Sequence, residues 1–146
     1  MEKYHKQTTL AQNVALSGTG VHSGKRTNIT IKPARENHGI KFRRVDLPGT
    51  QDIQALFKLV VDTSLATVLG TNGAIVSTIE HLMASFTGLD IDNALVEVDD
   101  YEMPIMDGSA MDFTRALTAA GTIEQDAPKH FIIVKKTIQV DRKSVV

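Results

Sequence analysis

The spacing of apolar residues between residues 78 and 89 constrains the fold more than any other feature of the sequence. An apolar side chain recurs every three or four residues, at Ile79, Leu82, Met83, Phe86 and Leu89. This period places the side chains on one face of an α-helix. Ser77 and Glu80 have the S-x-x-E spacing of a capping box, and Gly88 is a residue type common at helix ends. The pattern predicts an amphipathic helix over residues 78–88.

A second helix is predicted after residue 109. Ser109 and Asp112 repeat the capping-box spacing, and Gly121 follows the segment. The inward face would carry Phe113, Ala116, Leu117 and Ala120. Asp107-Gly108-Ser109 is interpreted as a turn that leads into the helix cap.

Short segments rich in β-branched residues, separated by Gly, Pro and Asn, are typical of strands. The predicted strands are residues 8–17, 27–33, 40–45 and 93–98. Residues 53–69 are ambiguous between a short helix and strands, although residues 64–69 favour a strand, and Asn72-Gly73 predicts a tight turn. The order of elements predicts an α+β fold, a two-layer sandwich of a mostly antiparallel β-sheet with two α-helices on one face.

The last part of the sequence predicts a domain boundary. Asp126-Ala127-Pro128 resembles a linker, and residues 131–140 have the composition of a strand that would need neighbours for pairing. We therefore expect residues 1–126 to form the first α+β domain. Residues 127–146 would be a linker and the first strand of a second domain that is otherwise absent, so the chain is interpreted as a fragment.

The composition excludes several classes of site. The chain has 146 residues and no Cys, which excludes a disulfide framework, a thiolate nucleophile and any zinc site built on Cys. A metal would have to bind His, Asp or Glu. The sequence has no apolar stretch of the length of a signal peptide core or a membrane span, so the predicted location is the cytoplasm.

Charge is distributed in blocks, although the net charge is −1. Residues 1–50 carry 9 Lys and Arg against 3 Asp and Glu, whereas residues 51–128 carry 2 against 13. The basic block is either an ordinary solvated surface or a surface for an anionic ligand. A non-catalytic α+β module that binds an anionic partner is therefore an alternative function.

Glu80 and His81 are the candidate chemical pair. At 100° per residue, His81 lies about 140° from the centre of the apolar stripe, so it points away from the core of its own domain. Glu80 has a structural explanation as the Glu of the capping box. At the positive end of a helix it would also be ionised and available as a proton acceptor.

The spacing around His81 does not supply a complete metal site. A hydrolytic zinc ion needs three protein ligands and an open position for water. Ala84 and Ser85 occupy the i+3 and i+4 positions from His81, so the H-E-x-x-H pattern is absent. The other histidines, His5, His22, His38 and His130, have no recognisable ligand spacing. Any missing ligands must come from outside this chain.

The segment GTGVHSGK places His22 between glycines that allow close approach to a ligand. A loop histidine can equally be an ordinary exposed residue. The segment is not a phosphate-binding P-loop, because it lacks the G-x-x-x-x-G-K-[ST] spacing. Lys41, Arg43 and Arg44 are interpreted as residues of a solvated strand rather than as a nucleic-acid site, since no aromatic residues interleave them.

Four segments of the chain together resemble a known enzyme family. They are GTGVHSG, FRRVDLP, TIEHLMASFTGLDIDNALVEV and EMPIMDGSA, in this order. The sequence resembles the first domain of the zinc-dependent UDP-3-O-acyl-N-acetylglucosamine deacetylases of lipid A biosynthesis. The resemblance implies two similar domains, each a β-sheet layered with two helices, with the active site between them. Such deacetylases can also be joined to a dehydratase domain.

The resemblance also implies roles for individual residues. Glu80 would be the general base and His81 the first zinc ligand, while His22 would line the active-site cleft. Ser64, Leu65 and Ala66 would lie near the substrate, UDP-3-O-acyl-N-acetylglucosamine. The remaining zinc ligands, a His and an Asp, and a later catalytic His and Lys belong to the second domain of the same polypeptide. We therefore expect the fragment alone to be inactive.

Overall fold

The computed structural model describes residues 5–140. Its centre is a five-stranded sheet in the order β2-β3-β9-β4-β5, antiparallel except where β4 runs parallel to β9. The strands are β2 (Val14–Thr19), β3 (Arg26–Pro33), β4 (Ile40–Arg44), β5 (Ile53–Gln54) and β9 (Ala94–Val98). The predicted strands at residues 27–33, 40–45 and 93–98 are thus confirmed.

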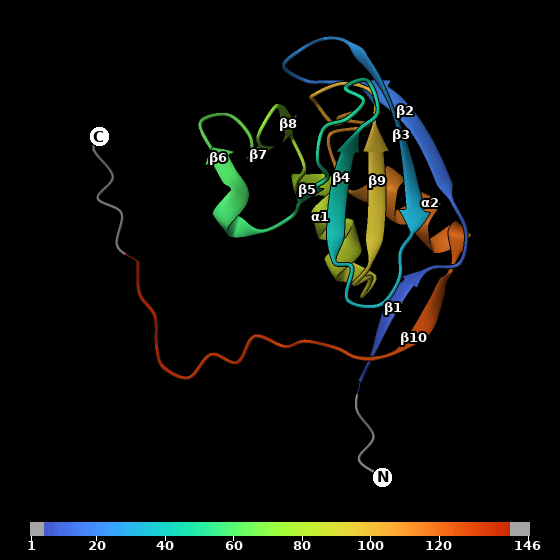
Figure 1. Ribbon diagram of the computed structural model, residues 1–146, viewed down its shortest axis with the longest axis vertical. Helices are drawn as coiled ribbons and strands as arrows, with labels where there is room; N and C mark the ends of the chain where they lie inside the picture. The colour runs from blue at the N-terminus through green and yellow to red at the C-terminus, as the bar shows by residue number, and fades with distance from the viewer. Residues whose placement is uncertain (1–4, 141–146) are drawn as a thin grey trace.

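Both helices cover one face of this sheet and lie behind it in Figure 1. They are α1 (Glu80–Gly88) and α2 (Met111–Ala120). Alternate residues of β3 and β9 point towards the helices. The apolar faces that the helical spacing predicts pack against these residues. The shared core includes Ile29, Ile31, Val96, Val98, Leu82, Phe86, Phe113 and Leu117. The α+β prediction, with two helices on one face of a mostly antiparallel sheet, is confirmed.

The predicted capping box at the start of α1 is wrong. Ser77 is the last residue of β8 (Ala74–Ser77), and the helix N-cap is Ile79, with no side-chain cap. The backbone of Ser77 instead accepts from Met103 N–H at 3.0 Å and donates to the Tyr101 carbonyl at 2.7 Å. Strand pairing takes precedence over capping because it satisfies the backbone groups of Ser77 directly. The carboxylate of Glu80 is therefore not used as a cap.

A small sheet lies beside the main one. It contains β6 (Val60–Asp62), β7 (Val68–Thr71) and β8, preceded by the 3-10 helix η1 (Phe57–Leu59). Figure 1 shows these elements to one side of β4 and β5. The predicted turn at Asn72-Gly73 is confirmed between β7 and β8, where Gly73 adopts φ 89°.

Two differences from the prediction concern the ends of the described chain. Residues 8–17 do not form one strand, because a bend at residues 11–12 separates β1 (Lys6–Leu10) from β2. Residues 126–128 are not a linker, since they are the end of β10 (Thr122–Pro128), which pairs with β1. The strand predicted at residues 131–140 is not formed, because residues 129–140 contain no strand and extend away from the domain in Figure 1. Residues 141–146, the rest of the predicted second-domain segment, lie outside the described residues.

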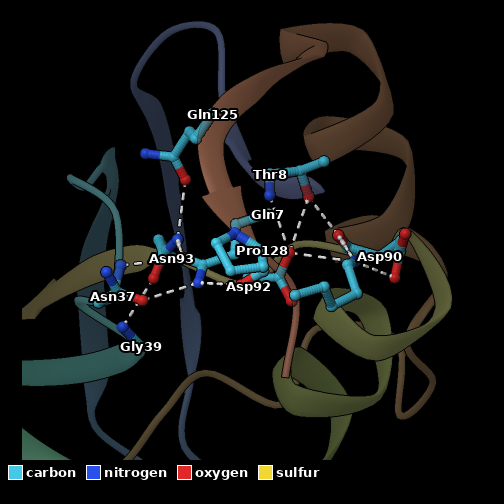
Figure 2. A network of polar contacts seen from close by, with 10 residues as sticks. Gln7, Thr8, Asn37, Gly39, Asp90, Asp92, Asn93, Gln125 and Pro128 are labelled. Atoms are coloured by element: carbon cyan, nitrogen blue, oxygen red, sulfur yellow. Dashed lines mark hydrogen bonds and ion pairs between the residues drawn. The ribbon is translucent and has the colours of Figure 1, made fainter. Parts of the chain in front are cut away.

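A buried polar network joins the β1-β10 ribbon to the main sheet (Figure 2). The side-chain amide of Asn93 donates to Gln7 Oε1 and to Gln125 Oε1, both at 2.8 Å, and its Oδ1 accepts from Gly39 N–H at 2.8 Å. Gln7 Nε2 in turn donates to Asn37 Oδ1 and to the Pro128 carbonyl. Each of these bonds satisfies a group that burial would otherwise leave unpaired, so the network fixes how the ribbon docks.

No helix within residues 5–140 is long and apolar enough to cross a membrane.

Candidate active site at the start of helix α1

Glu80 is the first residue of α1 and remains exposed. Its Oε1 accepts a hydrogen bond from the backbone N–H of Thr67, the residue that precedes β7. Burial alone would raise the pKa of Glu80, but the hydrogen bonds from the backbone N–H groups of Thr67 and of Glu80 itself outweigh it and lower the pKa below its ordinary value. The carboxylate is therefore ionised at neutral pH and held in one direction.

His81 is half-buried at the same helix end. Among the described residues, its Nδ1 is buried and has no hydrogen-bond partner. An imidazole nitrogen without a partner is an exception to the general pairing of buried polar atoms, and such exceptions often mark functional positions. Glu80 and His81 thus present a carboxylate and an unsatisfied imidazole side by side.

The segment of residues 64–66 approaches this pair. Asp62 Oδ1 accepts hydrogen bonds from the Ser64 backbone N–H at 3.1 Å and from Ser64 Oγ at 2.7 Å, which turns the chain sharply after β6. Leu65 is 81% exposed and Ala66 is half-buried. The next residue, Thr67, binds Glu80 and accepts at its carbonyl from Thr78 N–H at 3.2 Å. The structure therefore brings the predicted substrate segment to the start of α1.

The turn that carries His22 is connected to the start of α1 by the buried carboxylate of Glu102. The side chain of His22 is exposed, but its backbone N–H donates to Glu102 Oε1 at 2.9 Å, and Ser23 N–H donates to Glu102 Oε2 at 2.7 Å. Glu102 Oε1 also accepts from Thr78 Oγ1 at 3.4 Å. Thr78 lies two residues before Glu80, so the turn at His22 and the start of α1 share one anchor.

The described residues do not complete a zinc site. No group of three His, Asp or Glu side chains within residues 5–140 is arranged to hold a metal ion. Three of the other four histidines lie elsewhere: His5 packs edge-on against Phe131, His38 contacts Gly39, and His130 lies near Asn37. His81 can supply a single ligand and not a whole site, and it would do so through Nε2, because its Nδ1 is buried.

The basic strand β4 differs from the solvated strand that the sequence predicts. Arg44 is buried, bound to Asp46 at 2.6 Å and to the Ile75 carbonyl at 2.8 Å. Its exposed neighbour Arg43 binds Asp52 at 2.7 Å. Arg44 is buried rather than hydrated. The carboxylate of Asp46 compensates its charge, which makes this burial possible. Acidic partners thus neutralise these two basic residues.

Comparison with known proteins supplies the family. A family model described as UDP-3-O-acyl N-acetylglycosamine deacetylase matches residues 7–146. The chain belongs to this deacetylase family. A UDP-3-O-acyl-N-acetylglucosamine deacetylase of Myxococcus xanthus is 48% identical over 136 residues, which are 93% of this chain and 43% of the relative.

Other relatives in the deacetylase family give the same result. Proteins of the same name from Xylella fastidiosa and Stenotrophomonas maltophilia are 48% and 47% identical, each over 135 residues and 92% of this chain. The chain spans 44% and 45% of the lengths of these two relatives, which is less than half. Glu80, His81, His22 and residues 64–66 all lie inside the part that matches the deacetylase family.

Glu102 is a residue of this deacetylase-family domain whose role the sequence does not indicate. It is fully buried, with 0% of its surface exposed. Glu102 opens the segment EMPIMDGSA, but nothing in that segment predicts that its carboxylate is buried, since Glu is rarely buried. The turn at His22 lies about 80 residues earlier in the sequence. Its backbone N–H groups need an acceptor, and the structure shows that the Glu102 carboxylate provides it.

Proposed function

We propose that this chain is the first domain of a zinc-dependent deacetylase that hydrolyses the acetamide of UDP-3-O-acyl-N-acetylglucosamine in lipid A biosynthesis, in the cytoplasm. The observation that carries the proposal is the pair at the start of α1: an ionised Glu80 held by Thr67, beside the half-buried imidazole of His81. Family membership supplies the reaction class, and the pair supplies residues with the chemistry that an amide hydrolase needs.

Glu80 acts in this proposal as the general base. Its ionised carboxylate accepts the proton of the water molecule that attacks the amide carbonyl, and it later returns a proton to the leaving nitrogen. The hydrogen bond from Thr67 fixes its direction without protonating it. A carboxylate held in this way is oriented before the substrate arrives, which reduces the cost of positioning in the transition state.

His81 acts in this proposal as one zinc ligand. A bound zinc ion lowers the pKa of water and polarises the carbonyl of the substrate. The described residues provide one ligand only, so the other ligands are expected from the second domain of the same polypeptide. The 146-residue chain alone should therefore bind zinc weakly and hydrolyse nothing.

His22 and residues 64–66 form the proposed substrate-binding edge. Ser64 and Ala66 flank the exposed side chain of Leu65, and the whole segment leads directly into Thr67 beside Glu80. The turn that carries His22 shares Glu102 with the start of α1. These contacts are consistent with two loops that flank one catalytic carboxylate and meet the sugar nucleotide from two sides.

The deciding experiment measures acetate release and zinc content for two proteins. One is this chain, and the other is a full-length protein that contains this chain together with the proposed second domain. The expected result is stoichiometric zinc and turnover in the longer protein, with weak zinc binding and no turnover in the shorter one. Full turnover with tightly bound zinc in the 146-residue chain would contradict the proposed division of the site.

A further inference from the structure

The carboxylate of Glu102 connects two loops that are distant in sequence. Each of its oxygens accepts one backbone N–H from the turn after β2: Oε1 from His22 at 2.9 Å and Oε2 from Ser23 at 2.7 Å. Oε1 additionally faces Thr78 Oγ1 at 3.4 Å. The carboxylate of Glu102 thus binds one loop with two hydrogen bonds and the other with one.

The surroundings of Glu102 are built to admit a carboxylate. A Cβ atom placed on Gly20 would lie 2.4 Å from Glu102 Oε2 and 2.5 Å from Ser23 Oγ, so any larger residue would force the turn and the carboxylate apart. Burial would raise the pKa of Glu102, but the hydrogen bonds from His22 and Ser23 lower it below the ordinary value. The buried group is therefore a charged acceptor that its partners satisfy.

Thr78, the third partner, has a strained backbone. Its φ is 62°, a left-handed conformation that β-branched residues rarely adopt. Such strain persists only where surrounding contacts impose it, and here the contacts are Glu102 at the side chain and the Thr67 carbonyl at the backbone. Because Thr78 lies between β8 and α1, its conformation sets the direction in which Glu80 and His81 leave the sheet.

We infer that Glu102 is a positioning residue that holds the turn of His22 in register with the start of α1, so that His22 and the Glu80-His81 pair face one substrate. This inference rests on the proposed function. Glu102 itself is fully buried, so in this inference its effect on turnover passes through the position of His22, whose turn it binds with two hydrogen bonds.

The test is a double-mutant cycle between E102Q and H22A in the full-length protein, which contains this chain and the proposed second domain. Gln can accept only one of the two N–H groups and presents an NH₂ group to the other, so E102Q releases one side of the turn. We expect E102Q to lower kcat/KM by at least about tenfold when His22 is present, and by less than about twofold when His22 is already Ala. An equal loss in both backgrounds would mean a purely structural role and would overturn the inference.

E97Q is the matched control. Glu97 lies on β9 and pairs with Lys32 at 2.7 Å, away from the turn of His22, so the same substitution there should leave kcat/KM within about twofold. If E102Q prevents folding, G20A replaces it, because the added Cβ also pushes Oε2 away from the turn. G20A should then give the same dependence on His22, and an effect of G20A independent of His22 counts against the inference.

Hydrogen exchange separates this inference from the proposed function. In the 146-residue chain, the His22 and Ser23 amides should be protected, and E102Q should lower that protection at least about tenfold while E97Q does not. Unchanged protection in E102Q would overturn the positioning role whatever the activity shows. If the full-length wild-type protein does not release acetate, the proposed function fails, and the exchange result alone decides the role of Glu102.

Discussion

The backbone N–H of Thr67 donates a hydrogen bond to Oε1 of Glu80, and this bond joins the loop after β6 to the first residue of α1. It has two consequences. The carboxylate is stabilised in its ionised form, and the exposed segment of residues 64–66 is held beside it. Glu80 is thus directed by a tertiary contact rather than by the local helix cap that its sequence spacing indicates.

Replacing Glu80 should separate catalysis from stability. In the full-length protein we expect E80A to lower kcat by at least about a hundredfold, because a general base contributes about 10²- to 10⁴-fold. Zinc content should be unchanged, since Glu80 is not a proposed ligand. Acetate release, metal analysis and the melting temperature measure the three quantities. E124A, at an exposed position of β10, is the control, and a variant E80A that melts lower but keeps its rate would exclude the catalytic role.

Glu102 should make stability depend on acid pH. Its pKa is lowered in the folded protein relative to the ordinary Glu value of about 4.3. The carboxylate therefore stabilises the fold above about pH 4.3, and this contribution is lost as the pH falls through the lowered pKa. The difference in unfolding free energy between wild type and E102Q should be largest near pH 7 and should shrink below about pH 4. Urea titrations across this range measure it, and a constant difference would contradict the role of the charge.

Asn93 should be among the most sensitive polar residues of the domain. In N93A, the Gly39 N–H and Gln125 Oε1 lose their partner, whereas Gln7 Oε1 keeps its hydrogen bond from the Asn37 N–H. Each unsatisfied group costs about 1–3 kcal/mol, so we expect a total loss of at least about 2 kcal/mol in urea unfolding. Asn28 binds Asp99 at the surface, and N28A should cost less than about 1 kcal/mol. Similar losses for the two variants would argue against the network in Figure 2.

The two helix-end glycines should respond in opposite directions to alanine. Gly121 adopts φ 74° and ψ 167°, a region open essentially to glycine, so G121A should destabilise the fold by about 1–3 kcal/mol. Gly88 has no positive φ and lies in α1, with nothing within 4 Å of an added Cβ. G88A should therefore stabilise the fold by about 0.5–1 kcal/mol. Thermal unfolding of the two variants checks both signs, and a shared sign would contradict the conformational explanation.

Local pattern predicted much of the fold. The apolar stripe of α1, the alternation in β3 and β9, and the turn at Asn72-Gly73 depend on contacts close in sequence or on residue conformation, and each appears in the structure. The break between β1 and β2 was not predicted, because residues 11–13 are Ala-Gln-Asn and contain no Gly or Pro, and the chain bends there so that β1 can pair with β10. Pairing across more than 100 residues leaves no local signal.

The candidate site shows the same division. The sequence by itself determined that Glu80 and His81 stand together at a helix start, and the resemblance of its motifs named the deacetylase family. Only the tertiary structure decided that Ser77 does not cap the helix, that Thr67 directs Glu80, and that Glu102 joins the turn of His22 to Thr78. The physical reason is that helical periodicity follows from neighbouring residues, whereas the partner of a buried carboxylate depends on which distant backbone groups the packed fold leaves unpaired.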